Sequence, residues 1–436
     1  MATPMEVEEL DLLRDLRGRS YTGSGVFWIR DGELGVFEPE AAQRFNAANF
    51  RDLTLPDRLL DLLRRRRSTP VSWKQVRAAW IAQLRHVADG EGIARLATRM
   101  ADLLDQRLNR KLDLVWAAQE VSTRSLVPIV VDGLTPADTA RIVRDQTFKL
   151  QRLMAIEPAR ESLRKTARET FIQVSSGLVV RRELRDRRAG RRPRRLDLTD
   201  PIVDLLPALG MDRAVDSVTA VLTAIAGPPG ASAACMLYEL TRRPDWSARL
   251  TAELGAVAPA ELYAAPTSVA PATHRFVKET LRMWSPPLLL NRSARTDIEL
   301  GEARLAAGER YFLSSYLIHH DSRHWPDPDT FDPDRWLPGS ERIGCPASSY
   351  VPFGWSPRTC IGATLGTAQL MVLCHLLCTR YRVEVAEPEA VGMALGAVPL
   401  PLRFQGTITR LPAPPPGDGQ LRPALAVEPA ALACQG

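Results

Sequence analysis

The chain has 436 residues, of which 45% are hydrophobic and 25% charged, the composition of an ordinary soluble globular protein. Its 6 cysteines are too sparse for a disulfide-based secreted domain and favour a reducing compartment. The formal net charge is +6, but no basic stripe is interleaved with aromatics, which disfavours nucleic acid as a partner. We find neither a signal-peptide pattern nor an apolar run of roughly 18 residues, so we expect a cytoplasmic protein without a membrane anchor.

Along the chain, apolar periodicity predicts mostly helices with a few short strands. The stretch Gly25–Phe37 is typical of strand, whereas Trp73–Leu108 and Pro136–Ala155 have helical spacing. The arginine-rich stretch Arg181–Leu198 interrupts this pattern. We interpret it as a solvated helix end followed by a surface loop, with an anion-binding patch as the alternative.

Further elements follow the same two periods, as helices over Asp200–Gly227 and Gly362–Val383, hairpins over Arg292–Ile318 and a strand over Pro399–Leu411. The expected fold class is therefore α+β, mainly α with small β-sheets. We expect one domain over residues 1–411. The tail over 412–436 is rich in Pro, Ala and Gly and is predicted to be disordered.

One cysteine, Cys360, lies in the loop "FGWSPRTCIGATLG", directly ahead of a predicted helix. Free N–H groups at a helix start and the nearby Arg358 favour a thiolate, which predicts a lowered thiol pKa. Gly362 lets the backbone approach a flat ligand. No second ligand lies at zinc spacing. A lone thiolate suits an iron whose other ligands come from a macrocycle, which is haem. A buried structural cysteine is the alternative.

This loop resembles F-x-x-G-x-R-x-C-x-G, the haem-binding signature of the cytochrome P450 superfamily. The matching positions that the resemblance assigns to haem are Phe353, Arg358, Cys360 and Gly362. Ser356 departs from the pattern, because that family usually has glycine there. The resemblance extends from about Trp73 to Arg380. It implies the P450 fold, with haem b between the I helix and the Cys360 loop, and Cys360 as the axial ligand of the iron.

Two further motifs carry the resemblance. In "KETLRMW", Glu279 and Arg282 match the E-x-x-R of the family's K helix, where residues at i and i+3 share a helix face. In "FDPDRW", Arg335 matches the arginine that completes a structural Glu-Arg-Arg cluster. Without the resemblance, the first pair would be an ordinary surface ion pair of little energetic value.

Haem carries two propionates, and a buried carboxylate needs cationic or donor partners. The resemblance implies that four further residues supply them, namely Trp73, Arg77, Arg292 and His320. Each alone would be interpreted as a surface arginine or a satisfied histidine. A rival metal site at His319, His320, Asp321 and His324 is disfavoured by the Pro-Asp-Pro loop beside it. Cys374 and Cys378 flank His375 in an apolar helix and are interpreted as core residues.

The stretch "AIAGPPGASAAC" departs from the family. The I helix there usually reads A-G-x-D/E-T-T, and its acid and alcohol relay protons to dioxygen. The aligned positions of the oxygen groove are Gly227, Pro228, Pro229 and Gly230, with Pro229 in place of the acid and Gly230 in place of the alcohol. Two prolines and a glycine predict a helix that kinks or opens.

Two interpretations of this stretch remain open. In a packing variant, Ser232 supplies the missing hydroxyl. Otherwise protons come from water, the substrate or peroxide. Such departures accompany oxidative coupling, substrate-assisted oxidation, peroxide use or action on carrier-bound or peptide substrates.

The resemblance implies a soluble, monomeric, bacterial-type monooxygenase that oxidises an organic molecule, in secondary metabolism, with electrons from a separate ferredoxin or flavodoxin. Substrate contacts are expected from residues 50–75 and 150–160, from Ala224–Gly230 and from the apolar Leu288–Leu290. The first alternative is a catalytically silent helper that stabilises a partner enzyme. The broken I-helix motif permits it and the retained Cys360 loop disfavours it. A haem-based sensor is weaker, because no output domain is evident.

Overall fold

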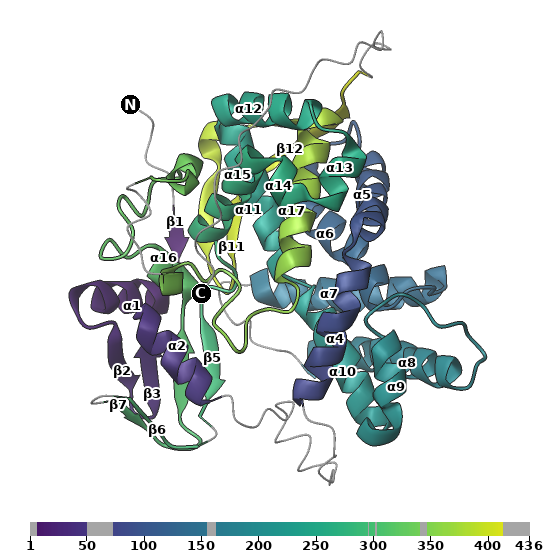
Figure 1. Cartoon of the computed structure of the whole chain (residues 1–436), viewed down its shortest axis with the longest axis horizontal. Coiled ribbons are helices and arrows are strands. Elements are labelled where there is room, and N and C mark those ends of the chain that lie inside the picture. Colours follow the sequence, from purple (N-terminus) through teal and green to yellow (C-terminus); the bar gives the residue numbers. More distant parts are fainter. Residues whose placement is uncertain are drawn as a thin grey trace.

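The computed structural model describes residues 7–49, 73–154, 163–294, 296–300, 303–340 and 347–412. Figure 1 shows a large helical part and a smaller strand-rich part at the lower left. The fold class predicted from the sequence, mainly α with small sheets, is confirmed. The tail predicted to be disordered lies, apart from residue 412, outside the described residues, as do residues 50–72 and 155–162 of the predicted substrate region.

The helices are α1 (Asp11–Thr22), α2 (Pro39–Ala48), α4 (Trp73–Val87), α5 (Gly90–Asp105), α6 (Leu114–Val130), α7 (Pro136–Met154), α8 (Leu163–Arg188), α9 (Asp200–Leu209), α10 (Met211–Ala224), α11 (Pro228–Arg242), α12 (Pro244–Gly255), α13 (Pro259–Ala264), α14 (Pro266–Val269), α15 (Pro271–Met283), α16 (Ser315–His319) and α17 (Ala363–Thr379). Short 3-10 turns lie at Pro333–Trp336, Ala347–Ser349 and Pro388–Ala390.

The strands form four small sheets. The largest has the order β2 (Val26–Arg30), β3 (Glu33–Val36), β8 (Arg310–Leu313) and β5 (Leu290–Ser293). Two three-stranded sheets have the orders β1 (Val7–Glu9), β10 (Gly392–Leu395), β11 (Pro399–Leu402) and β4 (Leu112–Asp113), β12 (Gln405–Arg410), β9 (Tyr381–Val385). The fourth is the hairpin of β6 (Ile298–Leu300) and β7 (Ala303–Leu305).

Three predicted helices have different boundaries in the structure. The helix predicted over Trp73–Leu108 divides where the Asp89 side chain accepts from Gly92 N–H at 2.7 Å and caps a new helix. The helix predicted over Asp200–Gly227 divides at Gly210, whose φ of 75° ends α9. The helix predicted from Gly362 ends at Thr379, because the following residues pair with β12.

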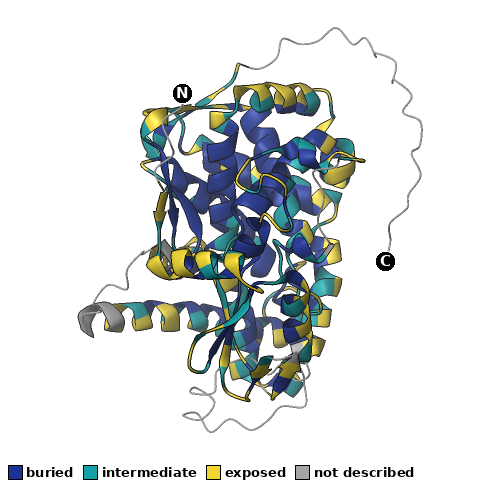
Figure 2. Cartoon of the chain, turned by 90° about the vertical axis from the view of Figure 1, so that its left-hand side faces the viewer, coloured by how far each residue is buried: buried dark blue, intermediate teal, exposed yellow. Residues whose placement is uncertain are grey.

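Helices α11 and α17 consist mostly of buried residues. Figure 2 shows that buried residues fill the centre of the molecule. The segment Met211–Arg242, which comprises α10 and α11, is long and apolar enough to cross a membrane by length and composition. Its apolar window is 61% buried inside the protein. That burial is expected of a core helix pair, whose apolar faces pack against other helices.

The arginine-rich stretch begins inside α8, which continues to Arg188, and then becomes a loop, as predicted. Its side chains are not all solvated. The guanidinium of Arg187 is fully buried and lies 2.7 Å from the Asp197 carboxylate. Arg187 also bonds the carboxylate of Glu183 at 2.9 Å. This buried ion pair closes the loop against the end of α8.

Candidate functional site

The Cys360 loop is a tight series of turns. Cys360 N–H donates to Phe353 C=O at 2.8 Å, and Arg358 N–H donates to Trp355 C=O at 2.9 Å. Gly354 has a φ of 77°, a left-handed conformation that favours glycine. The loop ends at Gly362, the N-cap residue of α17. Local turns therefore hold the cysteine at the start of a buried core helix, as the sequence predicted.

The prediction that the Cys360 thiol has a lowered pKa is wrong for the chain by itself. Burial raises this pKa, and that effect outweighs the lowering by Gly362 N–H and by Arg77. The side chain keeps accessible surface, yet the surrounding protein desolvates it. A bound metal would deprotonate the thiol outright, because the ion's charge dominates the local field.

The space beside the thiol is kept open by Gly362. A Cβ at this position would meet only the Cys360 Sγ, at 3.8 Å, which is ordinary contact. The protein's own packing therefore does not require a glycine there, whereas a flat ligand on the sulfur would use that space. This open cradle fits the haem that the family's signature implies.

Three arginines lie around the Cys360 loop. Arg77, on α4, donates to Thr359 C=O, and the thiol of Cys360 raises its pKa against the lowering by burial. Burial raises the pKa of the Tyr311 phenol, and the positive charges of Arg292 and Arg358 each lower it in part. Both guanidiniums therefore lie near that phenol. Arg292 and Tyr311 are paired across β5 and β8.

Arg292 has a buried donor without a hydrogen-bond acceptor among the described residues. Its Nε is buried and has no hydrogen-bond partner among the residues that the structure describes. Burial also lowers the pKa of its guanidinium. A buried donor without a partner is costly, and a carboxylate would satisfy it with a charge-assisted bond. The donor set of the three arginines therefore fits an anionic group such as a haem propionate.

The other two residues predicted to contact propionates lie differently. The Trp73 side chain is outside the described residues, although its backbone begins α4. His320 Nδ1 bonds Tyr316 C=O at 2.9 Å, and burial with the charge of Arg282 lowers its pKa to about 3. The structure thus groups His320 with Arg282 and Arg17 rather than with the arginines around Cys360.

His319 has a structural role, because both of its ring nitrogens are hydrogen-bonded to backbone groups. Its Nε2 accepts from Val351 N–H at 3.0 Å, so its Nδ1–H donates to Arg282 C=O at 3.0 Å. Burial keeps this ring neutral by lowering its pKa far below the ordinary value. Within the described ranges, no group of three or more His, Cys, Asp or Glu is placed to hold a metal ion. The rival metal site around His319 therefore has no support in the structure.

The Glu-Arg-Arg cluster is assembled and fully buried. Glu279 Oε1 lies 2.9 Å from Arg282 Nη2 and 3.0 Å from Arg335 Nε. Trp336 Nε1 donates to the second Glu279 oxygen at 3.0 Å. Arg282 Nη1 continues to the carbonyls of His319 and Pro328, at 2.8 and 2.7 Å. The cluster fastens α15 to the segment before the Cys360 loop and differs from the weak surface pair that the motif alone would suggest.

The helix at the predicted oxygen groove is open, as its prolines predicted. Helix α10 ends at Ala224, and α11 begins at Pro228. Ala226 N–H turns back to Thr223 C=O at 3.1 Å, and Ala231 N–H bonds Gly227 C=O at 3.0 Å. Proline is tolerated in a first helical turn, because its missing N–H would be unpaired there anyway.

Neither missing polar group is replaced at its aligned position. Pro229 and Gly230 carry no acid or alcohol. A Cβ at Gly230 would stand 1.9 Å from the side-chain amide of Gln119 and 2.8 Å from its Cα, so no side chain fits there. Ser232 is buried in the first turns of α11. Gln119 was missed by the sequence analysis; it is one of several polar side chains in α6, and nothing in the local sequence distinguishes it.

Two other features lie apart from the Cys360 loop. Cys374 and Cys378 are buried inside α17, as predicted, and burial lowers the pKa of the intervening His375 to about 4.

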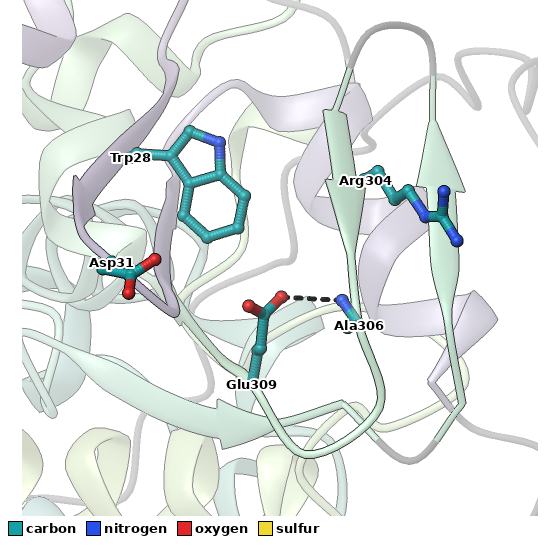
Figure 3. Close-up of a pocket in the computed structure, with 5 residues that line it drawn as sticks. All are labelled: Trp28, Asp31, Arg304, Ala306 and Glu309. Atoms are coloured by element: carbon teal, nitrogen blue, oxygen red, sulfur yellow. Dashed lines mark hydrogen bonds between the residues drawn. The ribbon is translucent and has the colours of Figure 1, made fainter.

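A surface pocket of about 500 Å³ lies in the strand-rich part (Figure 3). It is lined by Trp28, Asp31, Arg304, Ala306 and Glu309. Glu309 already accepts from Ala306 N–H at 2.7 Å, and no residue predicted for the site lines this pocket.

Comparison with known proteins gives one consistent family. Residues 216–401 match the family model described as Cytochrome P450. Thromboxane-A synthase of Sus scrofa is 37% identical over 120 residues, which are 27% of this chain and 22% of that protein. Cyclooctatin synthase of Streptomyces melanosporofaciens is 36% identical over 112 residues, 26% of this chain and 24% of that protein. The chain thus matches less than a third of the length of these relatives.

Solved structures are similar over nearly the whole chain. A zebra fish cytochrome P450 solved with progesterone has a TM-score of 0.72 at 18% sequence identity. The superposition covers 91% of this chain and 99% of the zebra fish chain. The haem domain of cytochrome P450DA has a TM-score of 0.70 at 16% identity, with 94% and 98% covered. At such identities the likeness shows the fold alone.

Proposed function

We propose that this chain, which belongs to the cytochrome P450 superfamily, is a haem-thiolate oxidoreductase in which Cys360 is the axial ligand of the iron. The observation that carries the proposal is the Cys360 loop itself. It presents one accessible sulfur at the start of α17, with open space at Gly362 and Arg77 beside it. Haem b, when bound, supplies the redox chemistry that oxidises an organic substrate.

The chain's own cations would hold the haem propionates. Arg292 brings a buried nitrogen that lacks a partner among the described residues, Arg77 donates to the loop from α4, and Arg358 lies in the loop itself. Charge-assisted bonds to guanidinium suit buried carboxylates in both geometry and energy. Trp73 and His320 belong to the same proposal by resemblance to the family.

Protons would reach the reacting centre without a side-chain relay. The acid and alcohol positions are Pro229 and Gly230, and Gln119 occupies the space in which a side chain on residue 230 would lie. Ser232 is the nearest hydroxyl along the helix. Water, the substrate or peroxide would then deliver the protons, which favours oxidative coupling, substrate-assisted or peroxide-driven oxidation over ordinary hydroxylation.

The remaining parts of the proposal concern partners and setting. Electrons would come from a separate ferredoxin or flavodoxin. The substrate would be a secondary metabolite, either free or bound to a carrier or peptide. We propose a cytoplasmic monomer, and the mostly buried α10–α11 segment is consistent with a core rather than a membrane anchor.

The test of the axial ligand is the difference spectrum of the reduced protein under carbon monoxide. We expect the strongly red-shifted Soret band of thiolate-ligated haem. Cys360→Ala should abolish that band, whereas Cys378→Ala, which removes a buried thiol near the other end of α17, should retain it. A band that Cys360→Ala leaves untouched would overturn the assignment.

The oxidant is tested separately by turnover. Product formation from a panel of candidate substrates is compared with hydrogen peroxide and with a ferredoxin–reductase pair. Turnover with peroxide alone would support the peroxide route. Turnover that requires the electron donors, with a normal solvent isotope effect, would favour dioxygen and proton delivery by water or substrate.

The absence of the acid and alcohol also favours a second candidate, a catalytically silent helper. Such a protein would keep the fold and stabilise a partner enzyme. It would show no turnover with either oxidant although its thiolate-type spectrum is intact. A partner enzyme whose activity rises on addition of this chain and of the Cys360→Ala variant alike would establish that function instead.

A further inference from the structure

The break between α10 and α11 is hydrogen-bonded by side chains of α6. Two residues of α6 one helical turn apart, Gln119 and Thr123, face the break. Gln119 is fully buried and Thr123 is nearly so. Polar groups at such depth are expected to have partners, because an unpaired one is costly.

Thr123 satisfies a carbonyl that the prolines release. In a continuous helix, Ile225 C=O would accept from the N–H of residue 229, but Pro229 has none. The Thr123 hydroxyl donates to that carbonyl at 3.2 Å instead. The hydroxyl thus replaces one lost backbone bond at the end of α10.

Gln119 closes the other side of the break. The surrounding groups determine the orientation of its amide, in which the oxygen accepts from Ala231 N–H at 3.1 Å and the nitrogen donates to Gly227 C=O at 3.3 Å. One side chain therefore bonds both the residue before α11 and an amide of its first turn. Both groups are in the stretch where the family has its oxygen groove.

The contact is possible only because Gly230 has no side chain. A Cβ there would overlap the Gln119 amide, at 1.9 Å, and would press on the Gln119 Cα, at 2.8 Å. Gln119 and Gly230 are therefore complementary. The close approach of α6 to α11 and the glycine at the alcohol position are one feature of the packing.

A third element, α17, is also bonded to α6. Gln369, buried in α17, donates from Nε2 to Ser122 C=O at 3.1 Å. The helix that follows the Cys360 loop is thereby bonded to the helix that braces the break. Gln369 does not bond the break itself, which makes it a matched control for the loss of a buried amide.

We propose that Gln119 is a positioning residue that fixes the geometry of the opened groove, because its amide bonds both Gly227 C=O and Ala231 N–H at the start of α11. The proposal rests on the proposed function for the groove's role beside haem. Its physical basis is that Gly227 C=O and Ala231 N–H, which bond each other at 3.0 Å, both lose a second partner when the amide is removed, so the first turn of α11 gains other conformations.

The test uses the haem-loaded full chain and the variants Gln119→Leu, Gln119→Glu and Gln369→Leu. Hydrogen exchange of a peptide over residues 223–233 reports the break directly. The carbon–oxygen stretching band of the reduced protein under carbon monoxide reports the surroundings of the ligand beside iron. Thermal unfolding reports overall stability.

We expect Gln119→Leu to accelerate exchange in this peptide by about tenfold and to shift or broaden the stretching band. Gln119→Glu keeps an acceptor for Ala231 N–H and should recover most of the protection. Gln369→Leu should lower the unfolding temperature comparably and leave both local measurements unchanged.

Wild-type exchange and an unshifted band in Gln119→Leu would overturn the proposal, as would equal changes in Gln369→Leu. If the wild-type protein lacks a thiolate-type spectrum, the proposed function fails. The exchange measurement still decides whether Gln119 holds the break.

Discussion

Gly230→Ala should destabilise the protein, although alanine is the better helix former. The substitution adds one Cβ to α11, where it would lie 2.8 Å from the Gln119 Cα, a backbone atom that cannot move aside without shifting α6. Overpacking of this kind costs about 1–3 kcal/mol, and a backbone contact puts it at the upper end. Replacing glycine by alanine in a helix returns about 1 kcal/mol. We therefore expect a net loss of about 2 kcal/mol.

Gly177→Ala in α8 is the matched control. A Cβ there meets only Val215 Cγ1, at 3.9 Å, so the helix gain of about 1 kcal/mol remains. For a chain of 436 residues the unfolding entropy is roughly 0.9 kcal/mol/K. The midpoint of thermal unfolding, followed by circular dichroism, should thus fall by about 2 °C in Gly230→Ala and rise by about 1 °C in Gly177→Ala.

The test is that the unfolding midpoint changes in opposite directions in Gly230→Ala and Gly177→Ala. A Gly230→Ala protein at or above the wild-type midpoint would refute the close approach of α6 and α11. Adding Gln119→Ala to Gly230→Ala should recover only part of the loss, because the amide contact is relieved and the contact with the Cα remains. The same geometry predicts that Gly230→Thr will not restore the family's alcohol.

Three further results are expected. Glu279→Ala leaves the guanidiniums of the buried cluster unpaired and should cost about 3–5 kcal/mol of unfolding free energy, whereas Glu299→Ala, from an exposed pair, should cost under about 0.5 kcal/mol; equal urea midpoints would contradict this. Arg292→Leu should speed haem transfer to apomyoglobin by about tenfold, and an unchanged rate would remove it from the haem site. Burial holds the pKa of His375 at about 4, below its unfolded value of about 6.5, so its stabilising contribution is present above pH 6.5 and is lost as the pH falls towards 4. His375→Gln should therefore lose about 2 kcal/mol less than the wild type between pH 7 and pH 5, and parallel pH profiles would contradict it.

The fold class, the turns around Cys360 and the pair of Glu279 and Arg282 could be predicted because their signals are local. The turns around Cys360 and the pair of Glu279 and Arg282 each lie within about one or two helical turns of sequence. The opening at Pro228 and Pro229 follows from chemistry within the residues themselves, since proline has no N–H to donate. Such features depend on residues that are close in sequence, so they can be recognised without the tertiary structure.

The sequence by itself thus determined a helical protein with a thiol-bearing loop and an opened helix, and the Glu-Arg-Arg cluster followed only from the resemblance to a family. Only the tertiary structure decided how buried each of these is, and so the sign of the pKa shift at Cys360, where desolvation outweighs the neighbouring donors. It alone paired Gln119 with Gly230, residues more than a hundred positions apart, and showed that the alcohol position has no room for a side chain. No periodicity encodes these outcomes, because they depend on the distance between two helix axes, and the packing of the whole core sets that distance.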